Sequence, residues 1–336
     1  MRSKIIQALK LTGEQPLSGN DIAEKLGVSR VAVWKHIETL RQEGYLIEAI
    51  PGQGYRLQEA DNILDVQAIA ASLKQDTIFK QFYYYPRLDS TSTRIRELLQ
   101  EGQAAEGTVV AALCQSEGRG RLGRDWSSPA GGLWFSFLLR PQLPLQETAC
   151  LSLLFALAIS RTLQDFVDKD EVMIKWPNDV LIKDKKVAGI LLETAGELDR
   201  IEYLISGIGI NVNLASDDFP PPLQGQATSL LENRGTPADI QAVFLSTLQS
   251  IDRYYRRFLQ EGFPAFCEEY KGLCYHLGRP VRIQTGQRVI AGTHIDIDSS
   301  GAMRVRSSTG IEVIHTGDVH VLDRGRDQHA SETTRN

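Results

Sequence analysis

Residues 118–126 hold the side chains of this chain that are best suited to anion chemistry. They place Arg119, Arg121 and Arg124 between three glycines and end in Trp126. A guanidinium group binds phosphate or carboxylate oxygens two at a time, and glycine lets the backbone approach a ligand without a side-chain clash. A solvated surface loop would explain one such arginine, but three among glycines after an apolar strand favour a loop that binds an anion.

The same segment matches the Gly-x-Gly-x-x-Gly pattern of dinucleotide-binding folds. Those folds need a strand before the glycines, a long helix that begins within them, and an acidic residue about 20 positions later. A strand over 109–113 is predicted, but 125–132 contains a proline and two glycines, and 141–143 contains no acid. We therefore exclude a nicotinamide or flavin site. The sequence also lacks the Gly-Lys-Ser or Gly-Lys-Thr ending of a Walker loop.

A second polar group lies further along the chain. Residues 175–179 read Lys-Trp-Pro-Asn-Asp, and we expect Asn178, Asp179, Lys186 and Asn211 at strand ends or glycine loops. Together with the arginines, these side chains suit a negatively charged substrate and a nucleotide phosphate.

Residues 89–93, Asp-Ser-Thr-Ser-Thr, precede a predicted helix over 94–100. Such a cluster offers backbone N–H groups and hydroxyls at a helix start. On these residues alone, simple capping of the helix is the better interpretation.

The elements that must position these groups predict a mixed sheet covered by helices. Apolar runs predict strands at 82–85, at 109–113, at 133–139, on both sides of a proline turn within 172–182, at 185–193, at 201–205 and at 207–213. Helices are predicted at 63–73, 94–100, 147–167 and 236–270. The helix over 147–167 has an apolar stripe at helical spacing, namely Leu151, Leu154, Phe155, Ala158 and Leu163.

The first 60 residues predict a winged helix-turn-helix. A short helix over 21–26 ends at a glycine, a second helix runs over 30–43, and two short strands flank a Pro-Gly turn at 51–52. The second helix has an apolar stripe of Val31 or Val33, Trp34, Ile37 and Leu40. We expect Arg30, Lys35 and Arg41 to contact DNA phosphates and the segment from Ser29 to Val33 to lie nearest the base edges. The alternative is a small module for dimerisation or protein contact.

Residues after 277 change to short strands at 281–283, 289–297, 302–306 and 311–315, separated by glycine turns. This pattern predicts a small antiparallel barrel. The polar tail is predicted to be disordered.

The totals limit the class of protein. The chain has 336 residues, 42% of them hydrophobic and 24% charged, with a formal net charge of −5. Its length fits two or three domains, and its charge means that DNA binding must come from a local patch. The four cysteines form no Cys-x-x-Cys pair, so we interpret them as reduced thiols of a cytoplasmic protein rather than a zinc site or a disulfide frame. No signal peptide or membrane span is predicted.

The motifs together resemble biotin–protein ligases. The resemblance is carried, in order along the chain, by 118–124, 175–179, 186–191 and 209–211. With its winged helix, the chain is similar to the bifunctional bacterial form, which is both a biotin ligase and the biotin-operon repressor. The resemblance covers nearly the whole chain.

The resemblance implies a two-step reaction. Biotin and Mg²⁺-ATP form biotinyl-5′-adenylate and pyrophosphate, and a lysine of the biotin carboxyl carrier protein of acetyl-CoA carboxylase then takes the biotin. The adenylate would also act as corepressor by favouring a homodimer on operator DNA. The implied fold is multidomain α+β: a winged helix over 1–60, a class II synthetase-like catalytic domain over 65–272, an SH3-like barrel over 277–325 and a tail over 326–336.

The resemblance also assigns roles to residues. Biotin or adenylate binding falls to Ser90, Thr91, Ser92, Gln115, Arg119, Gly120, Arg121, Asn178, Lys186 and Asn211. Catalytic roles fall to Arg119, Arg121, Lys186 and Asp179, with Asp179 as the candidate base for the incoming lysine. No residue is assigned as a metal ligand. The family often has asparagine at the position of Ser92, which leaves the role of this serine open.

Two other functions stay open at this point. The chain could be a ligase whose winged helix does not bind DNA, or a ligand-sensing regulator without catalysis. A lipoate ligase has a related core, but the arginine loop and the N-terminal head do not fit it.

Overall fold

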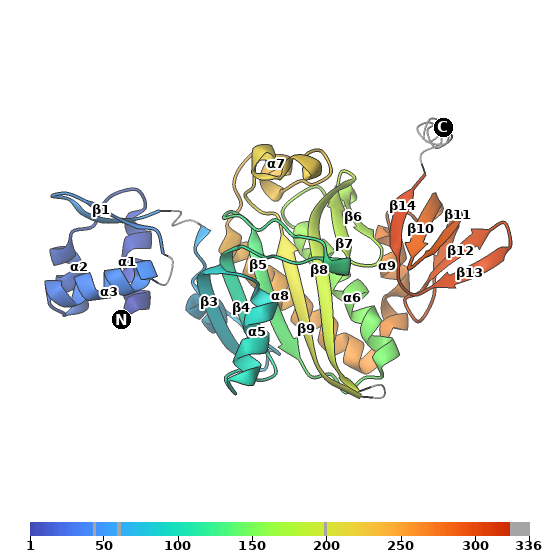
Figure 1. Cartoon of the computed structure of the whole chain (residues 1–336), viewed down its shortest axis with the longest axis horizontal. Coiled ribbons are helices and arrows are strands. Elements are labelled where there is room, and N and C mark those ends of the chain that lie inside the picture. Colours follow the sequence, from blue (N-terminus) through green and yellow to red (C-terminus); the bar gives the residue numbers. More distant parts are fainter. Residues whose placement is uncertain (43–44, 59–61, 198–199, 323–336) are drawn as a thin grey trace.

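The computed structural model describes residues 1–42, 45–58, 62–197 and 200–322. In sequence order the chain forms a small helical head with a two-stranded wing, a central sheet with helices, and a C-terminal group of strands (Figure 1). The tail predicted over 326–336 lies outside the described residues. Among the helices of the described ranges, the structure contains none that is both long and apolar enough to cross a membrane.

The N-terminal head has the predicted winged helix-turn-helix order. Its elements are α1 (Arg2–Thr12), α2 (Gly19–Leu26), α3 (Arg30–Gln42), β1 (Ile47–Ile50) and β2 (Gly54–Leu57). The two strands pair antiparallel as the wing. Gly27 ends α2 with a left-handed φ of 65°, which a residue without a β-carbon adopts readily, and so makes the turn toward α3.

One prediction for α3 is wrong. The sequence pattern places Trp34 in the apolar stripe, but 53% of Trp34 and 63% of Val31 are exposed. The other predicted positions, Val33, Ile37 and Leu40, form the buried face. Trp34 also has helical spacing to Ile37, and the packing of α1 and α2 decides that it stays outside the core.

The central part is built on a seven-stranded mixed sheet of order β3-β4-β5-β9-β8-β7-β6. Its strands are β3 (Gln81–Leu88), β4 (Thr108–Gln115), β5 (Leu133–Leu139), β6 (Val172–Lys175), β7 (Asp179–Ile182), β8 (Lys185–Glu197) and β9 (Arg200–Ile210). β3 and β4 are parallel, and the other neighbours are antiparallel. Every residue of β5 is buried, so both faces of the sheet are covered at its centre.

Helices cover the two faces of this sheet unequally (Figure 1). The helices are α4 (Val66–Ser72), α5 (Thr91–Gln100), α6 (Leu145–Leu163), α7 (Leu230–Arg234), α8 (Ile240–Glu261) and α9 (Cys267–Leu273). The helices α6 and α8 contribute to the large apolar core, and the predicted stripe of α6 is buried in it. On the other face, α5 packs through Ile95 and Leu98 onto Val110, Leu138 and Ile205.

The structure corrects the predicted bounds of three elements. The predicted helix over 236–270 divides into α8 and α9, because Gly262 takes a φ of 69° and Pro264 follows within a short 3-10 turn. The strand predicted to end before Pro86 continues through it as β3. Since β3 is an edge strand, a residue without an N–H group is tolerated there. The helix α6 ends at Leu163, four residues before the predicted end.

The C-terminal part is a five-stranded antiparallel sheet of order β13-β12-β11-β10-β14. Its strands are β10 (Pro280–Thr285), β11 (Arg288–Ile297), β12 (Met303–Ser307), β13 (Gly310–Ile314) and β14 (Asp318–Val321). Val281, Ile283 and Met303 belong to the same apolar core as α6 and α8. The C-terminal strands therefore pack on the central part, close to the 175–179 turn.

Candidate active site

The arginine loop follows β4 and folds back on itself. The backbone N–H of Trp126 donates to Gly118 O at 2.8 Å, and Gly120 N–H donates to Arg124 O at 2.7 Å. A β-carbon on Gly118 would lie 2.4 Å from Trp126 O, so only glycine fits there. Within the glycine pattern the chain makes only a short 3-10 turn at Arg121–Gly123, and Arg124 after it is extended, so no long helix begins there as a dinucleotide fold requires.

Two arginines of the loop contact the C-terminal part. Arg121 donates to Asn178 Oδ1 at 3.0 Å and to Thr316 Oγ1 at 3.1 Å. Arg124 forms an ion pair with Asp318 at the start of β14. Burial lowers the pKa of the Arg121 guanidinium, while the nearby Asp179 carboxylate acts in the opposite direction. The loop is therefore held from the side of β14, a contact that the sequence did not reveal.

The third arginine, Arg119, makes no contact with the C-terminal part that the structure shows among the described residues. Half of the Arg119 side chain is exposed, and its Nη2 lies 3.8 Å from Glu117 Oε2. Gly120, next to it, is placed by its bond to the carbonyl of Arg124. Arg119 is thus available to a solvent-borne anion at the edge of the loop.

The β6–β7 turn and β8 bring the second polar group beside the arginines. Lys186 Nζ lies 2.8 Å from Asp179 Oδ1, and both side chains are partly buried, with 35% and 17% exposed. Asn178 accepts from Arg121 with its Oδ1 and donates from Nδ2 to Ile190 O at 3.0 Å. The register pairs Asp179 with Gly189, so Asp179, Lys186 and Asn178 meet at one end of the sheet.

Trp126 lies over two glycines of adjacent strands. Gly189 and Gly209 pair across β8 and β9. A β-carbon on Gly209 would lie 2.4 Å from Trp126 Nε1, and one on Gly189 would lie 2.8 Å from the same indole ring. Lys186 Nζ sits 4.8 Å from the centre of the Trp126 ring, within cation–π range. Trp126 is therefore part of the site, although its sequence position gave no role beyond ending the loop.

The hydroxyl cluster forms a buried network at the start of α5. Thr91 N–H donates to Gln115 Oε1 at 2.8 Å, and Thr91 Oγ1 lies 2.7 Å from Ser136 Oγ. Ser92 Oγ lies 3.0 Å from the same Ser136 oxygen. Ser90 is the N-cap residue but makes no side-chain capping bond. The interpretation as simple capping is wrong, because the Thr91 and Ser92 hydroxyls face the sheet instead of the helix end.

A cavity of about 850 Å³ opens beside this network. Gln115, Gly118 and Trp126 line it, together with Leu46 of the head and Leu223. Gln115 Nε2 donates to Ser128 Oγ at 2.8 Å, which fixes the amide against the loop. Of the predicted ligand residues in this network, Gln115 lines a space of the size of a small-molecule site, and Thr91 reaches it only through its bond to Gln115.

Asn211 is buried at the end of β9, with 4% exposed. Its Nδ2 donates to Thr228 O at 2.9 Å and to Lys186 O at 3.4 Å. These bonds connect the strand that carries Lys186 to the segment before α7. The structure gives Asn211 a positioning role through Lys186, and a direct contact to a nucleotide stays a prediction.

The charges of the site are dominated by cations. Besides the arginines and Lys186, Lys175 lies near the same groups. Burial lowers its pKa and Asp179 raises it, while Lys186 and Arg124 act in the same direction as burial. Glu117, Asp179 and Asp318 are the carboxylates paired with these cations. Such an arrangement attracts an anionic group and stabilises negative charge that develops on phosphorus or on a carboxylate. Lys175 was not among the predicted site residues.

On the head, the predicted DNA residues separate into two groups. Ser29 Oγ accepts from Ala32 N–H at 3.2 Å at the start of α3, and Arg30 and Lys35 are exposed. Arg41 instead donates from Nε to Ile47 O at 2.8 Å and pairs with Glu38 at 2.6 Å. Arg41 therefore connects α3 to the wing, and a phosphate contact by it would compete with these bonds.

Comparisons with known proteins agree with this geometry. Residues 84–211 match the biotin/lipoate A/B protein ligase family, 2–56 match an HTH domain, and 276–322 match the biotin protein ligase C-terminal domain. The chain is 38% identical over 322 residues to the bifunctional ligase/repressor BirA of Bacillus spizizenii, covering 96% of this chain and 98% of that one.

The chain belongs to the biotin protein ligase family. The BirA of Escherichia coli is 31% identical over 85% of this chain and 87% of its own length. A biotin protein ligase from Aquifex aeolicus, solved in complex with biotin and ATP, aligns with a TM-score of 0.64 at 33% identity, covering 73% of this chain and 99% of that one. The arginine loop and the 175–179 turn thus lie in a biotin protein ligase fold, and the matches to BirA extend over the N-terminal head.

Proposed function

We propose that this chain is an ATP-dependent biotin–protein ligase that also acts as a biotin-responsive transcriptional repressor. The observation that carries the ligase proposal is the convergence of Arg121 and Lys186 on the Asn178–Asp179 turn. Trp126, which Lys186 Nζ contacts, also lines the cavity of about 850 Å³ and so connects the two cations to a small-molecule space. Family membership supplies the substrates, biotin and ATP.

In the first step, a biotin carboxylate oxygen attacks the α-phosphorus of ATP, and pyrophosphate leaves. Two anions must approach each other, so cations that neutralise them lower the barrier. Arg119, Arg121 and Lys186 are proposed to bind these anionic oxygens. The buried network of Thr91, Ser92 and Gln115 is proposed to orient the substrate by hydrogen bonds.

In the second step, a lysine amine of a carrier protein attacks the mixed anhydride carbonyl, and AMP leaves with the bonding electrons. The amine must lose a proton to become a nucleophile. Asp179 is the proposed base, since its carboxylate lies 17% exposed beside Lys186. The proposed acceptor is the biotin carboxyl carrier protein of acetyl-CoA carboxylase.

The residues present fit a magnesium ion brought in with ATP. Mg²⁺ prefers one or two carboxylates together with substrate phosphates, and Asp179 supplies a carboxylate next to the cations. When bound, the ion would neutralise phosphate charge. Asn178 Oδ1 is already used by Arg121.

The test of the ligase proposal is biotin-dependent exchange of labelled pyrophosphate into ATP. We expect exchange with biotin and none above background with lipoate as the control acid. Absence of exchange with biotin would refute adenylation and favour a ligand-sensing regulator.

We further propose that the head binds operator DNA as a homodimer when biotinyl-adenylate is bound, and that the protein acts in the cytoplasm. Exposed Arg30 and Lys35 on α3 support phosphate contacts. Cysteines that are thiols and not disulfides support a reducing compartment. We also propose that the chain divides into three domains, over 1–60, 65–272 and 277–325.

The DNA proposal is tested by selection from random-sequence duplexes with and without biotin and ATP. We expect a palindromic site that is bound more tightly when both substrates are present. Lys35→Ala should weaken binding and reduce the slope against log salt by about 1, whereas Lys74→Ala, exposed after α4, should not. DNA binding that is equally tight with and without biotin and ATP would contradict a biotin-responsive repressor and leave the ligase proposal unaffected.

A further inference from the structure

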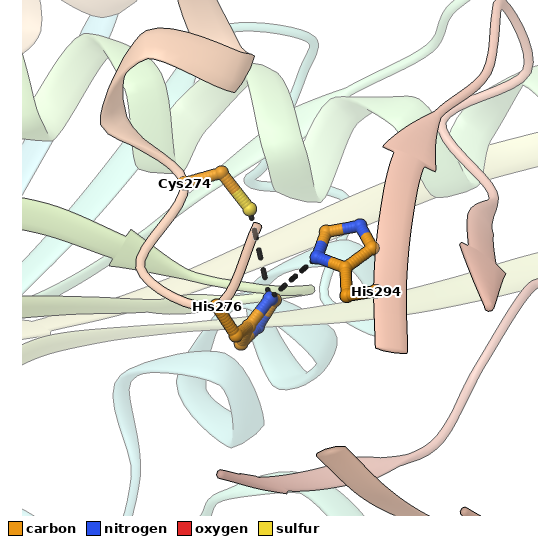
Figure 2. A group of neighbouring side chains, drawn as sticks. All are labelled: Cys274, His276 and His294. Atoms are coloured by element: carbon orange, nitrogen blue, oxygen red, sulfur yellow. Dashed lines mark hydrogen bonds between the residues drawn. The ribbon is translucent and has the colours of Figure 1, made fainter. Parts of the chain in front are cut away.

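Three buried side chains outside the described site lie together behind the 175–179 turn. Cys274, His276 and His294 offer ligand atoms within 4.8 Å of one another, and Figure 2 shows the Cys274 thiol and the His294 imidazole both directed at His276 Nδ1. Both imidazoles are fully buried. Such a group suggests a metal site at first sight, because Cys and His are the usual zinc ligands.

The hydrogen bonds determine where the protons are, and they exclude this metal site. The backbone N–H of Trp176 donates to His276 Nε2 at 3.0 Å, so Nε2 has the lone pair and Nδ1 carries the proton. A metal on His276 Nδ1 would need the proton on Nε2, where it would face the Trp176 N–H. The zinc interpretation therefore requires two donors to point at each other.

The remaining contacts complete a chain of neutral donors and acceptors. His276 Nδ1 lies 3.1 Å from His294 Nδ1, which must then accept. His294 Nε2 carries its own proton and donates to Asp296 O at 3.0 Å. Burial raises the pKa of the Cys274 thiol to about 12, so the sulfur stays protonated. Every imidazole nitrogen has a partner of the right kind, and this satisfies both buried rings.

This series of hydrogen bonds ends on the backbone of the 175–179 turn. Trp176 lies between Lys175 and the Asn178–Asp179 pair, and its indole Nε1 donates to Gly301 O at 3.0 Å. The backbone N–H of Tyr275, the residue before His276, donates to Ile174 O at 2.9 Å. The turn is thus held from behind by residues of the C-terminal part.

We infer that His276 and His294 form a neutral hydrogen-bond relay that positions the 175–179 turn, and with it Asn178 and Asp179, for adenylation. His276 accepts a hydrogen bond from the turn, and His294 accepts one from His276. Because His294 belongs to β11, the position of β11 determines the position of the turn through these two rings. Both are positioning residues, since neither lies at the reacting atoms. This inference rests on the proposed function for its kinetic readout.

The test compares His276→Gln with His276→Phe in the full chain. Glutamine keeps one acceptor and one donor on its amide, whereas phenylalanine keeps a ring of similar size without nitrogen. We expect His276→Phe to lower kcat for pyrophosphate exchange about 10- to 100-fold, because it leaves the Trp176 N–H buried without an acceptor. His276→Gln should stay within about threefold of the parent, and KM for biotin should change little in either.

Cys274→Ser is the matched control for a metal. The relay predicts parental activity for it, no bound zinc, and no effect of a zinc-selective chelator when Mg²⁺ is kept in excess. Loss of activity in Cys274→Ser together with stoichiometric zinc would overturn the relay. Parental kcat in His276→Phe, or equal loss of kcat and thermal stability in both His276 variants, would overturn the positioning role.

Hydrogen exchange of the Trp176 amide gives a readout that is independent of activity. It should be accelerated about tenfold or more in His276→Phe and unchanged in His276→Gln. If the parent chain shows no pyrophosphate exchange, the proposed function fails while the amide exchange still decides on the relay. Equal amide exchange in parent and His276→Phe would refute it.

Discussion

Lys186→Met should abolish most of the adenylation rate while leaving the fold intact. Methionine keeps an unbranched stem that can pack on Trp126, as the lysine does with its Nζ 4.8 Å from the ring centre. What is lost is the charge that we place on the substrate oxygens. Removing one preorganised donor of this type costs about 10²- to 10³-fold in kcat, or about 2.7–4 kcal/mol.

The same change has a smaller effect on stability, and its size follows from burial. Lys186 and Asp179 are 2.8 Å apart with 35% and 17% of their side chains exposed. Exposed pairs contribute about 0–1 kcal/mol, and breaking a fully buried pair costs about 3–5 kcal/mol. For this partly buried pair we expect a loss of about 1–2 kcal/mol. Adding Asp179→Asn should restore most of that stability but not the rate.

The assay is pyrophosphate exchange with saturating biotin, together with thermal unfolding. Lys183→Met is the matched control, since Lys183 lies three positions earlier at the β7–β8 turn, is 55% exposed and pairs with Glu171. It should leave kcat unchanged. Parental kcat in Lys186→Met would refute the reasoning, and equal loss in Lys183→Met would show that the effect is not specific to the site.

Three further predictions follow from the structure. Gly209→Ala places a β-carbon 2.4 Å from Trp126 Nε1, so it should displace the indole, change its fluorescence and cost about 1–3 kcal/mol; an unchanged emission spectrum would contradict this. The pair of Arg124 and Asp318, with 64% of the arginine exposed, should give a coupling below about 1 kcal/mol in a double-mutant cycle of unfolding, and a larger value would show a stronger latch. Burial lowers the pKa of His276 from 6.5 to about 3. Below pH 6.5 the unfolded chain therefore binds more protons than the folded chain. The free energy of unfolding should then fall by about 1.4 kcal/mol per pH unit as the pH drops from 6.5 toward 3. His276→Gln should show a shallower slope over pH 6 to 4, and an identical slope would refute the buried neutral state.

The sequence predicted the parts of the site that are carried by local spacing. The glycine–arginine pattern and the strand–turn–strand pattern over 172–182 place Arg121, Asn178 and Lys186 at sheet ends, and the structure brings these side chains together. Each of these signals is short-range, because a turn fixes the direction of the residues next to it. The exclusion of a dinucleotide fold rested on local residues as well.

Contacts between distant parts could not be predicted in this way. Thr316 reaches Arg121 across 195 positions, and nothing in the pattern of either segment identifies the other. His276 and His294 lie 18 positions apart on a connection and a strand, so their meeting depends on how β11 packs. Trp34 shows the same limit at smaller scale: it has helical spacing to Ile37, and tertiary packing decides that it stays outside the core.

The cations of the site have internal partners of different strength, and this orders how a substrate anion would engage them. Lys186 is paired with Asp179, Arg124 with Asp318, and Arg121 with the neutral oxygens of Asn178 and Thr316. Replacing a neutral acceptor by a phosphate oxygen adds the attraction between opposite charges to the bond, whereas Lys186 must exchange one carboxylate for another anion. Arg121 is therefore the residue with most to gain from a bound anion, because its burial already disfavours an uncompensated charge. Binding of the anion at Arg121 would release Asn178 from its bond, next to the carboxylate that we propose as the base.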